Sequence, residues 1–238
     1  MSWVSLFSGG KDSSWALHQA LSTDREVSHL LTVHPSQDSY MYHVPATDLA
    51  GLAAESIGRP LVEVTAEDLD ATTAVDAGAQ GDREVEPLEA TLRSLAAETT
   101  LDGLIVGAVE SEFQNSRIQA LADRLDIDVF APLWGADPAT ALREMVAGGF
   151  EIRLIQVAAR GLGREWLGRT IDTATIADLE ALAREHGVHV LGEGGEFETL
   201  VTDGPHMSRR LEYEAEPIWE GTRGHLRITD AWLSAEDD

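Results

Sequence analysis

The chain has 238 residues, of which 43% are hydrophobic and 25% charged, and its formal net charge at pH 7 is −25. This length and composition suit a globular protein with a sizeable core. The acidic balance disfavours non-specific nucleic-acid binding, which needs basic patches. The absence of cysteine excludes disulfides, thiolate zinc sites and iron–sulfur clusters.

Lysine is almost absent from the chain. The 17 basic residues are sixteen arginines and a single lysine, Lys11. An acid excess with little lysine is typical of a surface adapted to high salt, which predicts a halophilic organism. An acidic face for a basic partner stays open, although the acids are spread along the whole chain. Without an apolar run near 18 residues or a signal-peptide pattern, we expect a soluble, cytoplasmic protein.

The first predicted elements are a strand at residues 3–7, a glycine turn and a helix at residues 12–21. This arrangement points backbone N–H groups and the positive end of a helix dipole at an anion. Lys11 adds a point charge suited to phosphate. We therefore predict a phosphate-binding loop, although it lacks the Walker A pattern. The alternative is an ordinary strand-to-helix turn. The loop reads Ser8, Gly9, Gly10, Lys11, Asp12 and Ser13.

Strands alternate with helices through the next hundred residues. This spacing predicts an α/β fold with a doubly wound, five-stranded parallel sheet, in which ligands bind beyond the carboxyl ends of the strands. Residues 66–81 are acidic and rich in small side chains, and we expect a surface excursion there. Further strands are expected at residues 27–34, 60–65, 104–106 and 128–131, and helices at residues 48–57, from residue 85 and from residue 118.

The remaining sequence predicts a smaller α+β domain, with a boundary near residues 134–137. We therefore expect a nucleotide-binding domain at residues 1–134 and a substrate-binding domain at residues 135–238. Asp137 and Pro138 are a favourable helix start. A strand at residues 150–157, a helix at residues 176–183 and antiparallel strands at residues 210–219 and 224–233 complete this prediction.

Two polar segments are candidates for chemistry. Residues 192–199 hold three glycines and three glutamates, which predicts a flexible turn that presents Glu193 and Glu196 to a cation: a metal, an ammonium or a cationic substrate. An acidic hairpin is the alternative. Residues 107–117 follow the fourth strand and should face the nucleotide loop, where Arg117 could grip a phosphate or a carboxylate. The alternative for Arg117 is an arginine on a helix surface.

The loop at residues 8–13 resembles the pyrophosphate loop of the N-type ATP pyrophosphatases, which cleave ATP between the α and β phosphates and transfer AMP to a carbonyl or carboxyl oxygen. The chain further resembles one branch of that family, the archaeal diphthine–ammonia ligases. Phe113 stands where the family pattern has tyrosine, and Gln119 where it has glutamate. The resemblance rests on residues 8–13, 39–43, 107–117, 131–134 and, most specifically, 192–199 with 203–205.

The resemblance implies an enzyme that uses ATP, Mg²⁺ and ammonium to amidate diphthine on translation elongation factor 2. It implies no direct nucleic-acid or membrane partner and leaves a homodimer open. The implied catalytic residues are Lys11, Arg117, Glu193 and Glu196. ATP would bind Ser8, Gly9, Gly10, Lys11, Asp12, Ser13 and Gly107, and Asp12 would bind the metal. The modified factor would bind Tyr40, Tyr42, His43, Gln114, Trp134 and Thr199.

The missing cysteines also separate this chain from other relatives. Relatives that thiolate tRNA use cysteine to carry sulfur, and glutamine-dependent amidotransferases use a catalytic cysteine, so ammonia must be free or delivered by another chain. Two alternatives remain: a ligase that amidates a small-molecule carboxylate, and a nucleotide-binding module without turnover.

Overall fold

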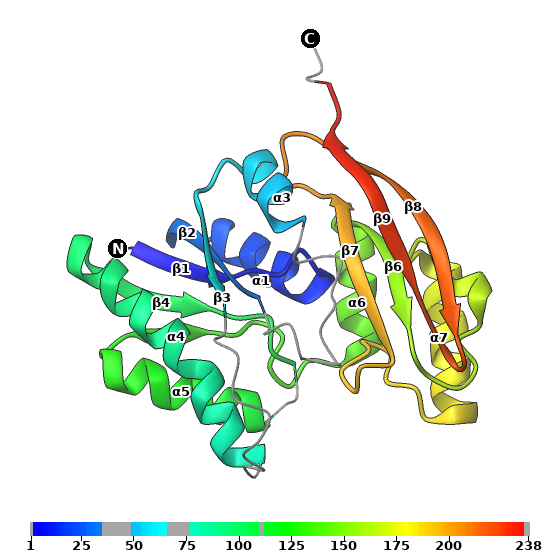
Figure 1. Ribbon diagram of the computed structural model, residues 1–238, viewed down its shortest axis with the longest axis horizontal. Helices are drawn as coiled ribbons and strands as arrows, with labels where there is room; N and C mark the ends of the chain where they lie inside the picture. Colours follow the sequence, from blue (N-terminus) through cyan, green and yellow to red (C-terminus); the bar gives the residue numbers. More distant parts are fainter. Residues whose placement is uncertain (1, 35–48, 66–76, 110–111, 236–238) are drawn as a thin grey trace.

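Two sheets of different kinds organise the computed structural model (Figure 1). The structure describes residues 2–34, 49–65, 77–109 and 112–235, except for the side chains of residues 77–84 and 112–115. Among the helices so described, none combines the length and apolar character needed to cross a membrane.

The first sheet is parallel and five-stranded, as predicted, and its strand order is β3-β2-β1-β4-β5. Its central strands are apolar on both faces, which suits a sheet that helices cover on both sides. The strand order reverses between β1 and β4, so the loop after β1 lies at the switch point where such sheets bind ligands. The strands are β1 (Ser2–Leu6), β2 (Glu26–His34), β3 (Leu61–Thr65), β4 (Leu101–Ile105) and β5 (Asp128–Phe130).

Helices cover this sheet on both faces. Leu17 of α1 and Ala53 of α3 are buried with Phe7 on one face, and Leu92 of α4 and Leu121 of α5 are buried on the other. The apolar side chains recur at helical spacing, which explains why these segments form amphipathic helices. The helices are α1 (Lys11–Leu21), α3 (Ala50–Ile57), α4 (Ala77–Glu98) and α5 (Glu112–Leu125).

The second sheet is antiparallel, with strand order β7-β6-β9-β8. Helices α6 and α7 cover one of its faces, and α1 and α3 pack against the other through Leu200, Leu211 and Leu226. Helix α1 therefore lies between the two sheets (Figure 1). The elements are α6 (Pro138–Ala147), β6 (Glu151–Val157), a 3₁₀ turn η1 (Arg164–Trp166), α7 (Thr173–His186), β7 (Phe197–Asp203), β8 (Leu211–Glu220) and β9 (Arg223–Leu233).

Two predicted segments differ from the structure. Helix α4 begins at Ala77, inside the stretch predicted as a surface excursion, whose residues 66–76 lie outside the described ones. The small residues at its start have no apolar period, so the sequence pattern marks only the later turns. The turn predicted at residues 192–199 is shorter in the structure, because strand β7 begins at Phe197. The domain boundary stays a prediction.

Candidate functional site

The nucleotide loop, defined as residues 8–13, joins β1 to α1. Gly9 has a φ of +78°, a conformation that favours glycine, so the turn depends on this residue. The Ser13 hydroxyl accepts the N–H of Ser8 at 3.2 Å and donates to the carbonyl of Gly10 at 3.1 Å. These bonds fix the loop at the positive end of α1, as an anion site requires.

Lys11 is buried in this loop, with only 3% of its surface exposed. Its Nζ lies 2.6 Å from Oδ2 of Asp12 and 5.6 Å from the ring centroid of Phe197. A buried amine needs a counter-charge because desolvation penalises the charged form. The Asp12 carboxylate supplies that charge, so the one lysine of the chain is held in place within the nucleotide loop.

The nucleotide loop is bonded to the edge of the second sheet. The N–H of Val201 donates to the carbonyl of Gly9 at 2.9 Å, and the N–H of Lys11 donates to Oγ1 of Thr199 at 3.2 Å. Both partners belong to β7, one of the two edge strands of its sheet. Thr199, predicted to bind the substrate, thus contacts the nucleotide loop itself.

Gly107 brings the end of β4 against the start of α1. A Cβ atom at this position would lie 2.6 Å from the carbonyl carbon of Asp12 and 2.7 Å from the nitrogen of Ser13. Only glycine allows such a close approach between two backbones. The structure therefore places Gly107 beside the nucleotide loop, where the sequence placed it.

Asp12 is the residue for which a metal role was predicted. Its Oδ2 atom contacts Lys11, whereas Oδ1 is buried and has no hydrogen-bond partner among the described residues. That oxygen suits one position of a magnesium ion, which takes one or two carboxylates and fills its other positions with phosphate and water. Within the described part of the chain, no group of three or more metal-ligating side chains occurs.

Glu196 holds together its own glycine-rich turn. Its carboxylate accepts the N–H of His189 at 3.1 Å and that of Gly194 at 2.8 Å. Gly192 and Gly195 adopt φ values of +74° and +76°, so the chain reverses on residues that favour this conformation. Glu193 lies on the same turn and is exposed. The carboxylate of Glu196 is therefore engaged by backbone amides.

Glu198, which the sequence reasoning missed, is half-buried on β7, whereas the predicted Glu193 is exposed. Burial raises the pKa of the Glu198 carboxyl, the Lys11 charge lowers it, and the carboxylates of Asp12 and Glu193 raise it further. No hydrogen bond or ion pair of Glu198 is found among the residues that the structure describes. Its signal in the sequence is a charged residue between Phe197 and Thr199, both of which are buried.

The other predicted residues lie on α5, on the turn after β5 or outside the described residues. Arg117 lies in α5 and is half-buried. Trp134 is 40% exposed, on the turn after β5. The side chain of Gln114, like Tyr40, Tyr42 and His43, lies outside the described residues.

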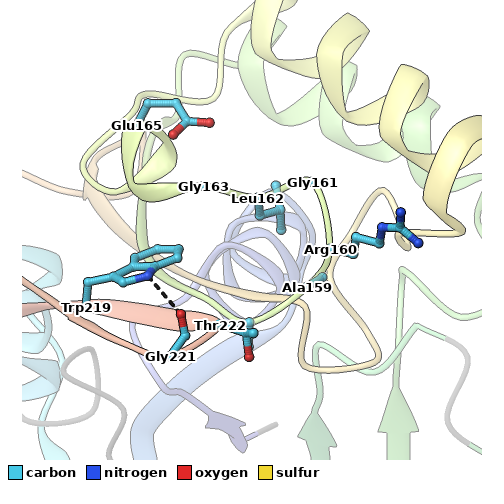
Figure 2. Close-up of a pocket in the computed structure, with 10 residues that line it drawn as sticks. Ala159, Arg160, Gly161, Leu162, Gly163, Glu165, Trp219, Gly221 and Thr222 are labelled. Carbon is cyan, nitrogen blue, oxygen red and sulfur yellow. Dashed lines mark hydrogen bonds between the residues drawn. The ribbon is translucent and has the colours of Figure 1, made fainter.

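An open cavity of about 720 Å³ lies in the second sheet's half of the molecule, between the loop after β6 and the tip of the β8–β9 hairpin (Figure 2). Trp219 and Glu165 both line it (Figure 2), and the indole N–H of Trp219 donates to the carbonyl of Gly221 at 3.1 Å. The N–H of Ala158, on the cavity wall, donates to the carbonyl of Glu196 at 2.8 Å. The cavity therefore adjoins the glycine-rich turn, although no predicted site residue lines it.

Comparison with known families gives two matches that together span most of the chain. Residues 1–128 match the model of the diphthamide synthase N-terminal domain, and residues 137–233 match that of the C-terminal domain. The nucleotide loop lies in the first match, and the glycine-rich turn and β7 lie in the second.

Individual relatives agree with these matches. A diphthine–ammonia ligase of Danio rerio is 34% identical over 220 residues, covering 89% of this chain and 86% of the relative. The diphthine–ammonia ligase of Homo sapiens is 32% identical over 226 residues, covering 90% of this chain and 84% of the relative. A solved structure described as a predicted subunit of tRNA methyltransferase from Methanocaldococcus jannaschii is 21% identical, covers 86% of this chain and 99% of its own, and has a TM-score of 0.42, which is too low to carry weight.

Proposed function

We propose that this chain, which belongs to the diphthamide synthase family, is a diphthine–ammonia ligase that converts a carboxylate of diphthine on elongation factor 2 into an amide. ATP and ammonium would be its other substrates, and AMP and pyrophosphate its products. The observation that best supports this proposal is the nucleotide loop: a glycine turn at a switch point, with a buried lysine, bonded to the strand that follows the glycine-rich turn.

The chemistry explains why such a loop is needed. A carboxylate is a poor acyl donor because its oxygen leaves badly. Transfer of AMP to that oxygen turns the carboxylate into an acyl phosphate anhydride, from which ammonia can displace AMP. The protein must therefore hold the β and γ phosphates as a leaving group and bring the carboxylate to the α phosphate. We assign the first task to the amides of the nucleotide loop and to Lys11.

Asp12 would hold Mg²⁺ through its unpartnered Oδ1, as its burial and chemistry allow. When bound there, the ion would offset negative charge on the phosphates. Lys11 keeps the other carboxylate oxygen of Asp12 in place at 2.6 Å, so a metal ligand would be oriented by the same residue that faces the phosphates.

Recognition of diphthine adds a second requirement, because this side chain carries a quaternary ammonium. Such groups prefer aromatic faces and carboxylates. We assign this role to Trp134 and Glu193, which are both exposed, together with Tyr40 and Tyr42. The acid excess and the single lysine support a cytoplasm of high salt as the setting of the enzyme.

One experiment tests the proposed function as a whole. The protein is incubated with ATP, magnesium, ammonium and elongation factor 2 isolated from cells that stop at diphthine. We expect AMP to form in an amount equal to the modified factor, and the factor to lose about one dalton, the difference between a hydroxyl and an amino group. AMP formed with a small carboxylate instead, or ATP bound without turnover, would contradict the proposal.

A further inference from the structure

The glycine-rich turn at residues 192–196 is bonded to a side chain that lies just before it, that of His189. The imidazole Nδ1 of His189 accepts the N–H of Leu191 at 3.3 Å and that of Glu193 at 3.4 Å. The backbone carbonyl of His189 accepts the N–H of Gly192, between these two residues, at 2.9 Å. Gly192 has a φ of +74°, a conformation that favours glycine. Three consecutive amides therefore donate to one histidine.

These bonds define the chemical state of the His189 ring. A nitrogen that accepts an N–H must present its lone pair, so Nδ1 carries no proton and the neutral ring bears its proton on Nε2. The histidine is half-buried, and its backbone N–H donates to the Glu196 carboxylate at 3.1 Å. Backbone and side chain of His189 are thus both bonded to the segment that carries Glu193, and Nδ1 faces that segment.

Glu193 depends on such bonds more than a residue of a helix or strand would. It lies between Gly192 and Gly194, outside any helix or strand, and it is exposed. Glycine on both sides leaves the backbone wide conformational freedom. The N–H of Gly194 is held by the Glu196 carboxylate at 2.8 Å, and the N–H of Glu193 by His189. Side-chain acceptors thus hold the backbone from which the Glu193 side chain extends.

The turn is joined to the second sheet by bonds that do not involve the imidazole. The carbonyl of Glu196 accepts the N–H of Ala158 at 2.8 Å, and Phe197 opens β7. Farther along β7, Thr199 and Val201 are bonded to the nucleotide loop. Loss of the imidazole should therefore release Glu193 and leave the nucleotide loop in place.

We propose that His189 is a positioning residue for recognition of the modified factor. This inference rests on the proposed function, in which the Glu193 carboxylate helps to bind the quaternary ammonium of diphthine. The role of His189 is to hold the Glu193 amide through Nδ1, so that the carboxylate is already in place when the factor arrives. Preorganisation of this kind improves affinity because less conformational freedom is lost on binding.

The test compares wild-type protein with three His189 variants. His189→Leu removes the acceptor, His189→Asn restores it because Oδ1 of asparagine takes the place of Nδ1, and His189→Gln places its amide near the position of Nε2 instead. At saturating ATP and ammonium, we expect KM for the modified factor to rise at least about fivefold in the leucine and glutamine variants and to stay within about twofold of wild type in His189→Asn. In all three, kcat and ATP affinity should stay within about twofold of wild type.

The matched control is His225→Leu. His225 is a half-buried histidine on β9, and no side-chain hydrogen bond of it is found within the described ranges, so this variant should match wild type. A loss of kcat and ATP affinity that accompanies the change in KM, or an equal change in all three His189 variants, would show a merely structural role and overturn the inference. Should His189→Leu fail to fold, the asparagine and glutamine variants alone decide the outcome.

A double-mutant cycle shows whether His189 acts through Glu193. In a Glu193→Gln background, the change His189→Leu should raise KM for the modified factor no further, because the carboxylate to be positioned is already absent. A further rise of the same size, or an unchanged KM in His189→Leu alone, would overturn the inference while wild-type turnover keeps the proposed function. If the wild type forms no AMP with the modified factor, the proposed function fails, and this inference with it.

Discussion

The nucleotide loop and the glycine-rich turn at residues 192–196 are both short, glycine-rich and polar, yet they use their polar groups differently. In the turn, the Glu196 carboxylate is bound by the amides of His189 and Gly194. In the nucleotide loop, the bonds cross from one sheet's half to the other, through Val201 and Thr199. Composition marks both segments as unusual. Only the bonds between distant residues distinguish them: those of the nucleotide loop join it to β7, whereas those of Glu196 stay within the turn and its neighbour His189.

The largest effect should come from Lys11, the residue that most distinguishes the nucleotide loop from the turn. Replacing Lys11 by Met removes the buried ammonium group to which we assign the phosphates. We expect kcat/KM for AMP formation to fall about 100-fold or more, roughly 3 kcal/mol of transition-state stabilisation. The matched control is Arg59→Met, an exposed cation at the end of α3, which should leave the rate unchanged. If the kcat/KM of Lys11→Met stayed within about threefold of wild type, Lys11 would not act in AMP formation, and this difference between the nucleotide loop and the turn would be contradicted.

The second prediction concerns a contact between α1 and the segment after β7 that lies outside the nucleotide loop. His206 stacks on Phe150 with ring centroids 5.1 Å apart, and it lies 6.2 Å from His18 of α1. Burial, and then the charge of His18, lower the pKa of His206 to about 4. The unfolded chain protonates this histidine near pH 6.5, and the folded chain only near pH 4. Folding stability should therefore fall as the pH drops from 6.5 to 4.

The measurement is the free energy of unfolding at several pH values for wild type and His206→Phe. The contribution of His206 should reach roughly 3 kcal/mol at pH 4, from 1.36 kcal/mol per pKa unit. Phenylalanine keeps the stacking and cannot be protonated, so the variant should lose less stability across this range. Parallel pH curves for the two proteins would show that His206 is not buried against α1 in solution.

Gly107 tests the close approach between β4 and the nucleotide loop. In Gly107→Ala, the added Cβ would meet backbone atoms of Asp12 and Ser13 at 2.6–2.7 Å, so the start of α1 must shift. We expect a loss of roughly 1–3 kcal/mol in unfolding free energy, with weaker ATP binding. Gly51→Ala is the matched control on α3, where nothing lies within 4 Å, and it should gain up to about 1 kcal/mol. Equal effects of the two changes would contradict the packing described.

The smallest expected effect is a difference in ATP affinity between a Thr199 variant and a Glu196 variant. Thr199→Val keeps the side-chain shape and removes the acceptor of the Lys11 N–H, which costs roughly 1 kcal/mol or more in a buried place. We expect ATP affinity to fall about fivefold. Glu196→Gln weakens only the turn, so its ATP affinity should equal that of wild type. Isothermal titration with ATP measures the affinity of both variants. A larger loss of ATP affinity in Glu196→Gln than in Thr199→Val would contradict the assignment of Thr199 to the nucleotide loop and of Glu196 to the turn.

The sequence predicts the first half of this molecule better than the second. A strand, a glycine turn and an amphipathic helix are local signals, so the sequence predicted the elements around residues 8–13 and the parallel sheet, and the structure confirms both. Strand β7 was missed because its glycine-rich approach resembles a turn and Glu198 interrupts its apolar pattern. The hydrogen bond from Lys11 to Thr199 joins residues 188 positions apart, so a local sequence pattern cannot predict it.

The most direct test of the account is a crystal structure with magnesium and an ATP analogue that cannot be cleaved between the α and β phosphates. The account predicts that the β and γ phosphates accept hydrogen bonds from the amides of the nucleotide loop, with the Lys11 ammonium group beside them and the α phosphate on the side of β7. A nucleotide bound elsewhere, with the loop unchanged and Lys11 still facing only Asp12, would contradict it.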